Sequence, residues 1–227
     1  MKQKKRLIVI EGTDGSGKAT QTKLLVSRLQ ENKYSVKTLS FPQYGKKSAG
    51  MIEEYLNGTY GDPRDVSPHA ASFFYAVDRF DASFGIRRLL EDHIVVLDRY
   101  VDSNAGHQGG KIADAKKRMQ FLTWLYDTEY GILNIPKPDL VLILHVPADI
   151  GQRMVAQKQL RSYIKEGTHD KHEADLEHLK NAEASYLWLA RQFPQDHKVI
   201  ECIENGALLA PDRIHEKIWT EIRHLLS

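Results

Sequence analysis

The chain has 227 residues, of which 41% are hydrophobic and 27% charged, and its formal net charge is +2. This composition is typical of a globular protein, and the nearly neutral charge argues against a general affinity for nucleic acid or membranes. Cys202 is the only cysteine, which excludes an intramolecular disulfide and fits a reducing cytoplasm. The apolar run before Glu11 is too short for a signal peptide, and no stretch approaches transmembrane length.

Short apolar runs predict β-strands, and they alternate with helical patterns along the chain. The predicted strands are 7–10, 35–40, 93–97, 139–146 and 198–203. The predicted helices are 17–31, 47–57, 67–90, 112–130, 149–158, 171–192 and 211–226. The third and fourth strands are continuously apolar, which is typical of strands covered on both faces of a parallel sheet. The order predicts an α/β fold, a doubly wound five-stranded parallel sheet flanked by helices, in a single domain over 1–227.

The segment between the first predicted strand and the first predicted helix gives the strongest functional signal. Residues 11–20 read Glu-Gly-Thr-Asp-Gly-Ser-Gly-Lys-Ala-Thr. The glycines let the backbone curl so that N–H groups point at an anion, and the helix N-terminus adds a partial positive charge. The strand before and the helix after make a chance glycine turn the weaker interpretation. The residues predicted to bind nucleotide phosphates are Gly12, Thr13, Asp14, Gly15, Ser16, Gly17, Lys18, Ala19 and Thr20.

One position of this loop departs from the usual phosphate-loop pattern. The lysine is normally followed by Ser or Thr, whose hydroxyl binds Mg²⁺. Here Ala19 follows Lys18, and Thr20 comes one place later. Adjacent helical residues point about 100° apart, so Thr20 is a poor direct substitute. Either carboxylates and water hold the metal, or the loop does not use metal in the usual way.

Polar residues follow the third predicted strand, where Asp98, Arg99 and Tyr100 end an apolar run. The carboxyl ends of parallel strands line one crevice, so we expect these residues to face the glycine loop. Asp98 suits an acidic residue on the metal side, and Arg99 suits a phosphate ligand. The alternative is a structural Asp98–Arg99 pair. Because the glycine loop is expected in the same crevice, a functional role of Asp98 and Arg99 is favoured over a structural one.

A polar segment at about 158–171 has no sustained periodicity. Long unpatterned segments in compact domains are usually lids or disordered, and we predict a lid. The histidines close to this segment lack the His-Glu-x-x-His spacing of a zinc site, so we expect no zinc there.

Six short segments, taken in order, resemble the thymidylate kinases, a family of P-loop nucleoside monophosphate kinases. They are 11–18, Phe-Pro-Gln-Tyr at 41–44, Tyr-Ala-Val-Asp-Arg at 75–79, the Asp-Arg-Tyr segment at 98–104, Pro-Lys-Pro-Asp-Leu at 136–140 and Asp-Lys-His-Glu at 170–173. The resemblance covers most of the chain. It implies direct in-line transfer of the ATP γ-phosphoryl group to dTMP, which gives dTDP for dTTP synthesis. It also implies Mg²⁺ as cofactor and a cytoplasmic homodimer.

The resemblance further implies roles for individual residues. The implied catalytic residues are Asp14, Lys18, Arg99 and Arg161. The implied dTMP-binding residues are Asp14, Phe41, Tyr44, Tyr75, Arg79, Arg99, Ser103, Asn104, His107, His172 and Glu173. The implied metal ligands are Asp14, Asp98 and Glu173.

In this interpretation Phe41 and Tyr75 flank the base, because aromatic faces stack on bases. Arg79 donates to a base carbonyl. Its alternative is a salt bridge on the helix surface with Asp78 or Asp81. Ser103 and Asn104 read base edges, and His107 stands where many members carry Tyr.

Family members place a catalytic arginine either in the phosphate loop beside the aspartate or in the lid. Here the loop position is Gly15, so a lid cation is expected: Arg161, with Lys158 and Lys165 as alternatives. A solvated Arg161 without a role is the competing interpretation. Two further functions stay open at this point. One is a kinase for another pyrimidine nucleotide or nucleoside, and the other is a regulator that binds a nucleotide without transferring phosphate.

Overall fold

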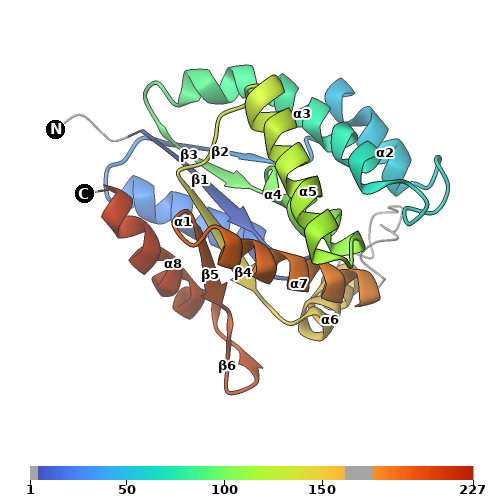
Figure 1. The fold of residues 1–227 in the computed structure, drawn as a ribbon. Helices are drawn as coiled ribbons and strands as arrows, with labels where there is room; N and C mark the ends of the chain where they lie inside the picture. Colours follow the sequence, from blue (N-terminus) through green and yellow to red (C-terminus); the bar gives the residue numbers. More distant parts are fainter. Residues whose placement is uncertain (1–4, 162–175, 227) are drawn as a thin grey trace.

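The computed structural model describes residues 5–161 and 176–226 (Figure 1). Its main sheet has five parallel strands, as predicted, and their order is β2-β3-β1-β4-β5. The strands are β1 (Arg6–Glu11), β2 (Val36–Ser40), β3 (Ile94–Asp98), β4 (Leu140–His145) and β5 (His197–Glu201). The predicted strands are therefore confirmed, with small shifts at their ends.

Helices connect the strands and cover both faces of the sheet. They are α1 (Lys18–Glu31), α2 (Gly50–Leu56), α3 (Pro68–Leu89), α4 (Asp102–His107), α5 (Ala115–Tyr126), α6 (Ala148–Arg161), α7 (Leu176–Gln192) and α8 (Pro211–Leu226). A 3₁₀ turn at Lys47–Ala49 precedes α2, another lies at Gly109–Lys111, and a π-helical turn at Asp127–Ile132 extends α5. After β5 a small antiparallel hairpin, β6 (Ile203–Glu204) and β7 (Ala207–Leu208), projects from the body (Figure 1).

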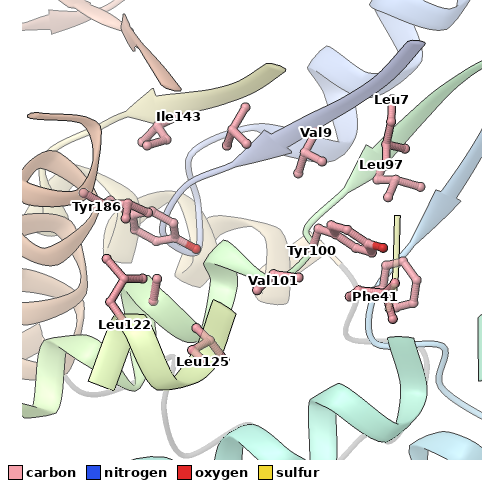
Figure 2. Packing of buried hydrophobic residues seen from close by; sticks show 14 of the residues in the cluster. Leu7, Val9, Phe41, Leu97, Tyr100, Val101, Leu122, Leu125, Ile143 and Tyr186 are labelled. Atoms are coloured by element: carbon pink, nitrogen blue, oxygen red, sulfur yellow. The ribbon is translucent and has the colours of Figure 1, made fainter. Parts of the chain in front are cut away.

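Alternate side chains of the strands build two separate cores, because successive residues of a strand point to opposite faces. On one face Ile8 and Ile10 of β1 pack with apolar residues of α1 and α8. On the other face Leu7 and Val9 belong to a cluster with residues from α3, α5 and α7. Figure 2 shows this cluster, with Leu122 and Leu125 of α5 and Tyr186 of α7 labelled. The continuous apolar runs of the central strands are explained by this two-sided burial.

The structure corrects the predicted helix at 112–130. Residues 112–114 form a loop after the 3₁₀ turn, the α-helix is α5, and the last part is π-helical. The unpredicted α4 has a polar sequence with weak helix propensity. Tertiary contact holds it: a Cβ on Gly106 would lie 2.4 Å from the Tyr186 ring of α7. Only glycine allows α4 to lie this close to α7.

The carboxyl ends of β1, β3 and β4 meet where the strand order reverses around β1. Ligands of open α/β sheets bind at such a switch point. The backbone hydrogen bond from Arg99 N–H to the Ile10 carbonyl, 3.0 Å long, joins the segment after β3 to the end of β1. The two predicted functional segments are therefore neighbours.

Candidate active site

The loop between β1 and α1 folds back in front of the helix N-terminus. Gly12 and Gly15 have φ angles of 141° and 80°, which glycine adopts readily. A Cβ on Gly15 would lie 2.1 Å from the Gly151 carbonyl oxygen of α6, so no side chain fits there. Lys18 is 8% exposed, and its Nζ donates to the Thr13 carbonyl oxygen at 2.7 Å. The loop has the curled backbone and the inward lysine that phosphate binding requires.

The environment of Lys18 favours an anionic ligand. Burial and the nearby Arg99 guanidinium lower the pKa of Lys18 to about 8, although nearby carboxylates oppose this shift. A phosphate in the loop would add negative charge and hold the ammonium group protonated.

Arg99 and Asp14 form an ion pair at the mouth of the phosphate loop. Nη2 of Arg99 donates to Asp14 Oδ1, and Nη1 donates to the Gly12 carbonyl oxygen at 3.3 Å. Burial raises the pKa of Asp14, but Arg99 and Lys18 outweigh burial and hold this pKa well below its usual range. The alternative of a structural Asp98–Arg99 pair is wrong, because the carboxylate that pairs with Arg99 belongs to Asp14.

The backbone of Arg99 has a φ of 67°. This left-handed conformation is uncommon for a residue with a side chain, and such residues cluster at functional sites. The conformation turns the chain after β3 so that the guanidinium group reaches the phosphate loop.

Glu11, the last residue of β1, is fully buried. Its carboxylate accepts hydrogen bonds from Tyr100 N–H at 2.7 Å, Ser103 Oγ at 2.8 Å and Tyr186 OH at 2.9 Å. Burial raises the pKa of Glu11 to about 7. No role was predicted for Glu11, although an acidic residue directly after an apolar strand was the available signal. Since the Ser103 hydroxyl donates to Glu11, only its oxygen lone pairs remain for a ligand.

A pocket of about 250 Å³ opens beside the Arg99–Asp14 pair. Nine predicted substrate residues line it: Asp14, Phe41, Tyr44, Tyr75, Arg79, Arg99, Ser103, Asn104 and His107. Five residues without a predicted role complete the lining: Pro42, Leu56, Tyr100, Gln108 and His178. The structure thus gathers residues far apart in sequence into one pocket next to the phosphate loop.

Arg79 lies at the inner end of this lining and is 1% exposed. Its Nε and Nη2 each donate to the Glu129 carboxylate at 2.6 Å, and Nη1 donates to the Tyr100 carbonyl oxygen at 3.2 Å. The predicted alternative partners Asp78 and Asp81 are therefore wrong. Glu129 comes from the π-helical turn after α5, and nothing in the sequence marked it.

The aromatic residues of the pocket differ in burial. Phe41 is 5% exposed and packs on Tyr100 with ring centres 5.6 Å apart. Tyr75 is half-buried and meets Tyr55 edge-on at 6.4 Å, whereas Tyr44 is 59% exposed. Phe41 thus forms a fixed wall, and Tyr44 lies at the solvent edge.

Several predicted residues stand apart from the pocket. His172, Glu173 and most of the predicted lid at 158–171 lie outside the described residues. Arg161 is the last residue of α6. Asp98, at the end of β3, is half-buried and is not part of the pocket lining. Over 5–161 and 176–226, no group of three or more His, Cys, Asp and Glu residues forms a metal-binding cluster.

Comparison with known proteins agrees with these features. The family model described as thymidylate kinase matches residues 10–207. Thymidylate kinase of Mycobacterium tuberculosis is 34% identical over 188 residues, which cover 82% of this chain and 86% of the relative. A probable thymidylate kinase of Pyrococcus horikoshii is 28% identical and covers 96% of both chains. A solved thymidylate kinase structure from Candida albicans superposes with a TM-score of 0.73 at 22% identity, over 99% of this chain and 94% of that one.

Proposed function

Because this chain belongs to the thymidylate kinase family, which uses ATP to phosphorylate dTMP, we propose that the pocket beside the phosphate loop is its dTMP site. The observation that carries the proposal is the Arg99–Asp14 ion pair, which joins the pocket to the loop. An acceptor phosphate held at Arg99 lies next to the place where a donor phosphate would bind. Direct transfer needs this proximity and charge neutralisation rather than a covalent intermediate.

The donor end is the phosphate loop. Backbone N–H groups at the start of α1 and the Lys18 ammonium group bind the ATP phosphates. In the structure, Lys18 Nζ donates to the Thr13 carbonyl oxygen at 2.7 Å. We propose that Lys18 turns from this carbonyl to the β- and γ-phosphate oxygens, where it neutralises charge as transfer proceeds.

The acceptor end discriminates the base. We propose that thymine lies between Phe41 and Tyr75, with Arg79 directed at a base carbonyl. A guanidinium group has five N–H donors, and three of those of Arg79 are used by Glu129 and Tyr100. The remaining donors are held in a fixed direction by this ion pair. Fixed donors favour a base with a carbonyl acceptor at that position.

Mg²⁺ is the proposed metal cofactor, and the residues fit a site in which phosphates and water supply most ligands. Mg²⁺ usually keeps several waters and binds one or two carboxylates together with substrate phosphates. Asp14 and Asp98 are two of the three carboxylates that act on Lys18, the other being Glu11, and Glu173 stays a proposed third metal ligand. Ala19 and Thr20 are both exposed at the start of α1, and Ala19 has no hydroxyl to offer. When bound, the ion supplies positive charge to the transferring phosphoryl group.

A catalytic cation from the lid is proposed on steric grounds. Position 15 has no room for an arginine, because its Cβ would overlap the Gly151 carbonyl oxygen. The phosphate loop therefore offers no such cation at that place. We propose Arg161, at the end of α6, which begins against this loop.

We further propose that a second copy of the chain covers α3. Four of its apolar residues are 39–54% exposed: Phe73, Val77, Phe80 and Phe84. Their spacing places them on one face of the helix, and exposed apolar patches mark interaction sites. Sedimentation of wild type should give a dimer, and Phe80→Glu should shift it to the monomer. A wild-type monomer at micromolar concentration would contradict this proposal.

The cytoplasm is the proposed location. In the described ranges, every helix is too short or too polar to cross a lipid bilayer. Fractionation of cells that express the tagged chain tests the location directly.

Calorimetry tests the acceptor site. Arg99→Ala should weaken dTMP binding by roughly tenfold or more, because a charge-assisted hydrogen bond contributes about 1.5–3 kcal/mol. Thymidine, which lacks the phosphate, should bind wild type and variant alike. An equal loss for both ligands would assign Arg99 a structural role instead.

A further inference from the structure

Arg99 is supported from a second side by two histidines of different helices. Nη1 of Arg99 lies 3.3 Å from Nε2 of His107, the last residue of α4. Nδ1 of His107 lies 3.2 Å from Nε2 of His178, in the first turn of α7. The two imidazole rings are nearly parallel, with an interplanar angle of 25°. All three side chains line the pocket.

Chemistry fixes which atoms donate and which accept in this hydrogen-bonded chain from Arg99 through His107 to His178. Arginine has no acceptor, so Nε2 of His107 must accept the hydrogen bond from Arg99. A neutral imidazole carries one proton, which in His107 must therefore sit on Nδ1. That proton is donated to His178, so Nε2 of His178 must be unprotonated. Only this arrangement satisfies both contacts, and it requires both rings to be neutral.

The surroundings favour the neutral state of His107. Burial and Arg99 lower the pKa of His107 well below its ordinary value, and His178 and Lys18 add to the effect while Asp14 opposes it. Tyr186 of α7 meets the His107 ring edge-on at 5.9 Å. Groups from the phosphate loop, α1, the segment after β3 and α7 thus face this ring.

We propose that His178, acting through neutral His107, is a positioning residue for Arg99. The proposal rests on the proposed role of Arg99 as the ligand of the acceptor phosphate. His178 orients the imidazole, and the imidazole orients the guanidinium group that receives the phosphate. A second proton on either imidazole ring would place two N–H donors opposite each other and break the hydrogen-bonded chain. Through His107, His178 links Arg99 to the first turn of α7.

Tautomer assignment tests the chain without reference to activity. Long-range ¹H–¹⁵N correlation spectra of protein labelled at histidine report which ring nitrogens carry protons. At pH 8 we expect a proton on Nδ1 of His107 and none on Nε2 of either ring, with His107→Gln and His178→Gln used for assignment. A proton on Nε2 of His107 would overturn the proposal. This result does not depend on which nucleotide the enzyme phosphorylates.

Kinetics test the consequence for the phosphate. His178→Leu removes the acceptor and should raise the KM for dTMP by about two- to tenfold, with little change in the KM for ATP. His178→Gln keeps an amide oxygen that can accept from Nδ1 of His107, so its KM at pH 8 should stay within twofold of wild type. Lys180→Leu, an exposed change on the same helix, is the matched control. A His178→Leu variant with unchanged KM, or a Gln variant as impaired as Leu, would refute the positioning role.

The tautomer test and the kinetic test separate the histidine contacts from the proposed function. If dTMP proves a poor acceptor while the tautomers are as expected, the proposed function fails and the histidine chain stands.

Discussion

The Glu129 carboxylate receives two hydrogen bonds of 2.6 Å from Arg79, and the two side chains are 0% and 1% exposed. Removal of one partner from a buried ion pair leaves an uncompensated charge, which typically costs about 3–5 kcal/mol. The pair also sets the direction of Arg79 in the pocket. It would therefore couple the stability of the fold to the proposed recognition of the base by Arg79.

Glu129→Gln should lower the free energy of unfolding by about 3 kcal/mol or more and raise the KM for dTMP more than the KM for ATP. Urea unfolding and initial rates measure the two effects. The control is Glu216→Gln, which removes the more exposed Arg28–Glu216 pair and should change stability by less than about 1 kcal/mol. Similar losses in both variants would contradict the role of the Arg79–Glu129 pair.

Lys18→Ala should reduce kcat by at least roughly a hundredfold, because the ammonium group stabilises charge only as the phosphoryl group transfers. The melting temperature should stay close to wild type, because removal of a buried cation relieves its desolvation. In the free enzyme, where the pKa of Lys18 is about 8, the charge is lost above that pH. The KM for ATP should therefore rise above pH 8 in wild type. Activity within tenfold of wild type would argue against the phosphate-loop assignment.

Gly151→Ala should reduce activity strongly, because its Cβ would lie 2.7 Å from the Asp14 carbonyl oxygen in the phosphate loop. Either α6 or the loop must move, and both carry proposed catalytic residues. Gly85→Ala in α3 is the matched control, since its Cβ meets nothing within 4 Å. That change should stabilise the fold by up to about 1 kcal/mol and leave the rate unchanged. Full activity of Gly151→Ala would show that the contact is not needed.

His197, the first residue of β5, contacts the first residue of α4. Its Nε2 pairs with Asp102 of α4 at 2.9 Å, and its Nδ1 pairs with Asp196 at 2.7 Å. Burial lowers the pKa of His197, but the two carboxylates outweigh burial and raise this pKa to about 9. The protonated form is thus favoured in the folded state. Its stabilisation, on the order of 3 kcal/mol, is fully present below about pH 6.5 and is lost as the pH rises through 9.

His197→Gln should therefore lower the melting temperature strongly at pH 6 and only slightly at pH 10. His224→Gln, at an exposed position of α8, is the control and should have little effect at either pH. A loss of stability that is the same at both pH values would mean that the charge of His197 does not contribute.

The sheet could be predicted from sequence because its physical signal is local. β3 and β4 are apolar at almost every position, and the glycine loop sits between a strand and a helix that both have clear patterns. α4 carried no such signal, because its short polar sequence is held by close packing on α7. The small hairpin turns at Asn205-Gly206. It was not predicted, because the strand predicted at 198–203 ran into its first strand.

The site was predictable only in part, because only some of its residues lie in local sequence motifs. Motifs marked Asp14, Arg79 and Arg99, and the structure brings them to one pocket. Glu129, the partner of Arg79, lies 50 residues from it, and His178, the partner of His107, lies 71 residues from it, and both are on elements without a motif. Long-range pairing of this kind depends on the fold and leaves no pattern in the chain. Membership of the thymidylate kinase family also excludes the alternative of a regulator without transferase activity.

The central claim, that this pocket selects dTMP through Arg79, is tested most directly by an acceptor panel. Initial rates with ATP, Mg²⁺ and dTMP, dCMP, dAMP or dGMP give kcat/KM for each acceptor, in wild type and in Arg79→Ala. The double variant Arg79→Met/Glu129→Leu serves if Arg79→Ala unfolds, because it leaves no unpaired buried charge.

Wild type should prefer dTMP over dCMP by about ten- to a hundredfold, because cytosine presents an amino donor to Arg79 where thymine presents a carbonyl acceptor. The two purine monophosphates should be poorer still, since a two-ring base needs more room than thymine in a pocket of about 250 Å³. In the Arg79 variants the gap between dTMP and dCMP should narrow to a few-fold while dTMP turnover slows. Efficient dCMP or dAMP turnover with little dTMP activity in wild type, or an unchanged gap in the variants, would contradict the account.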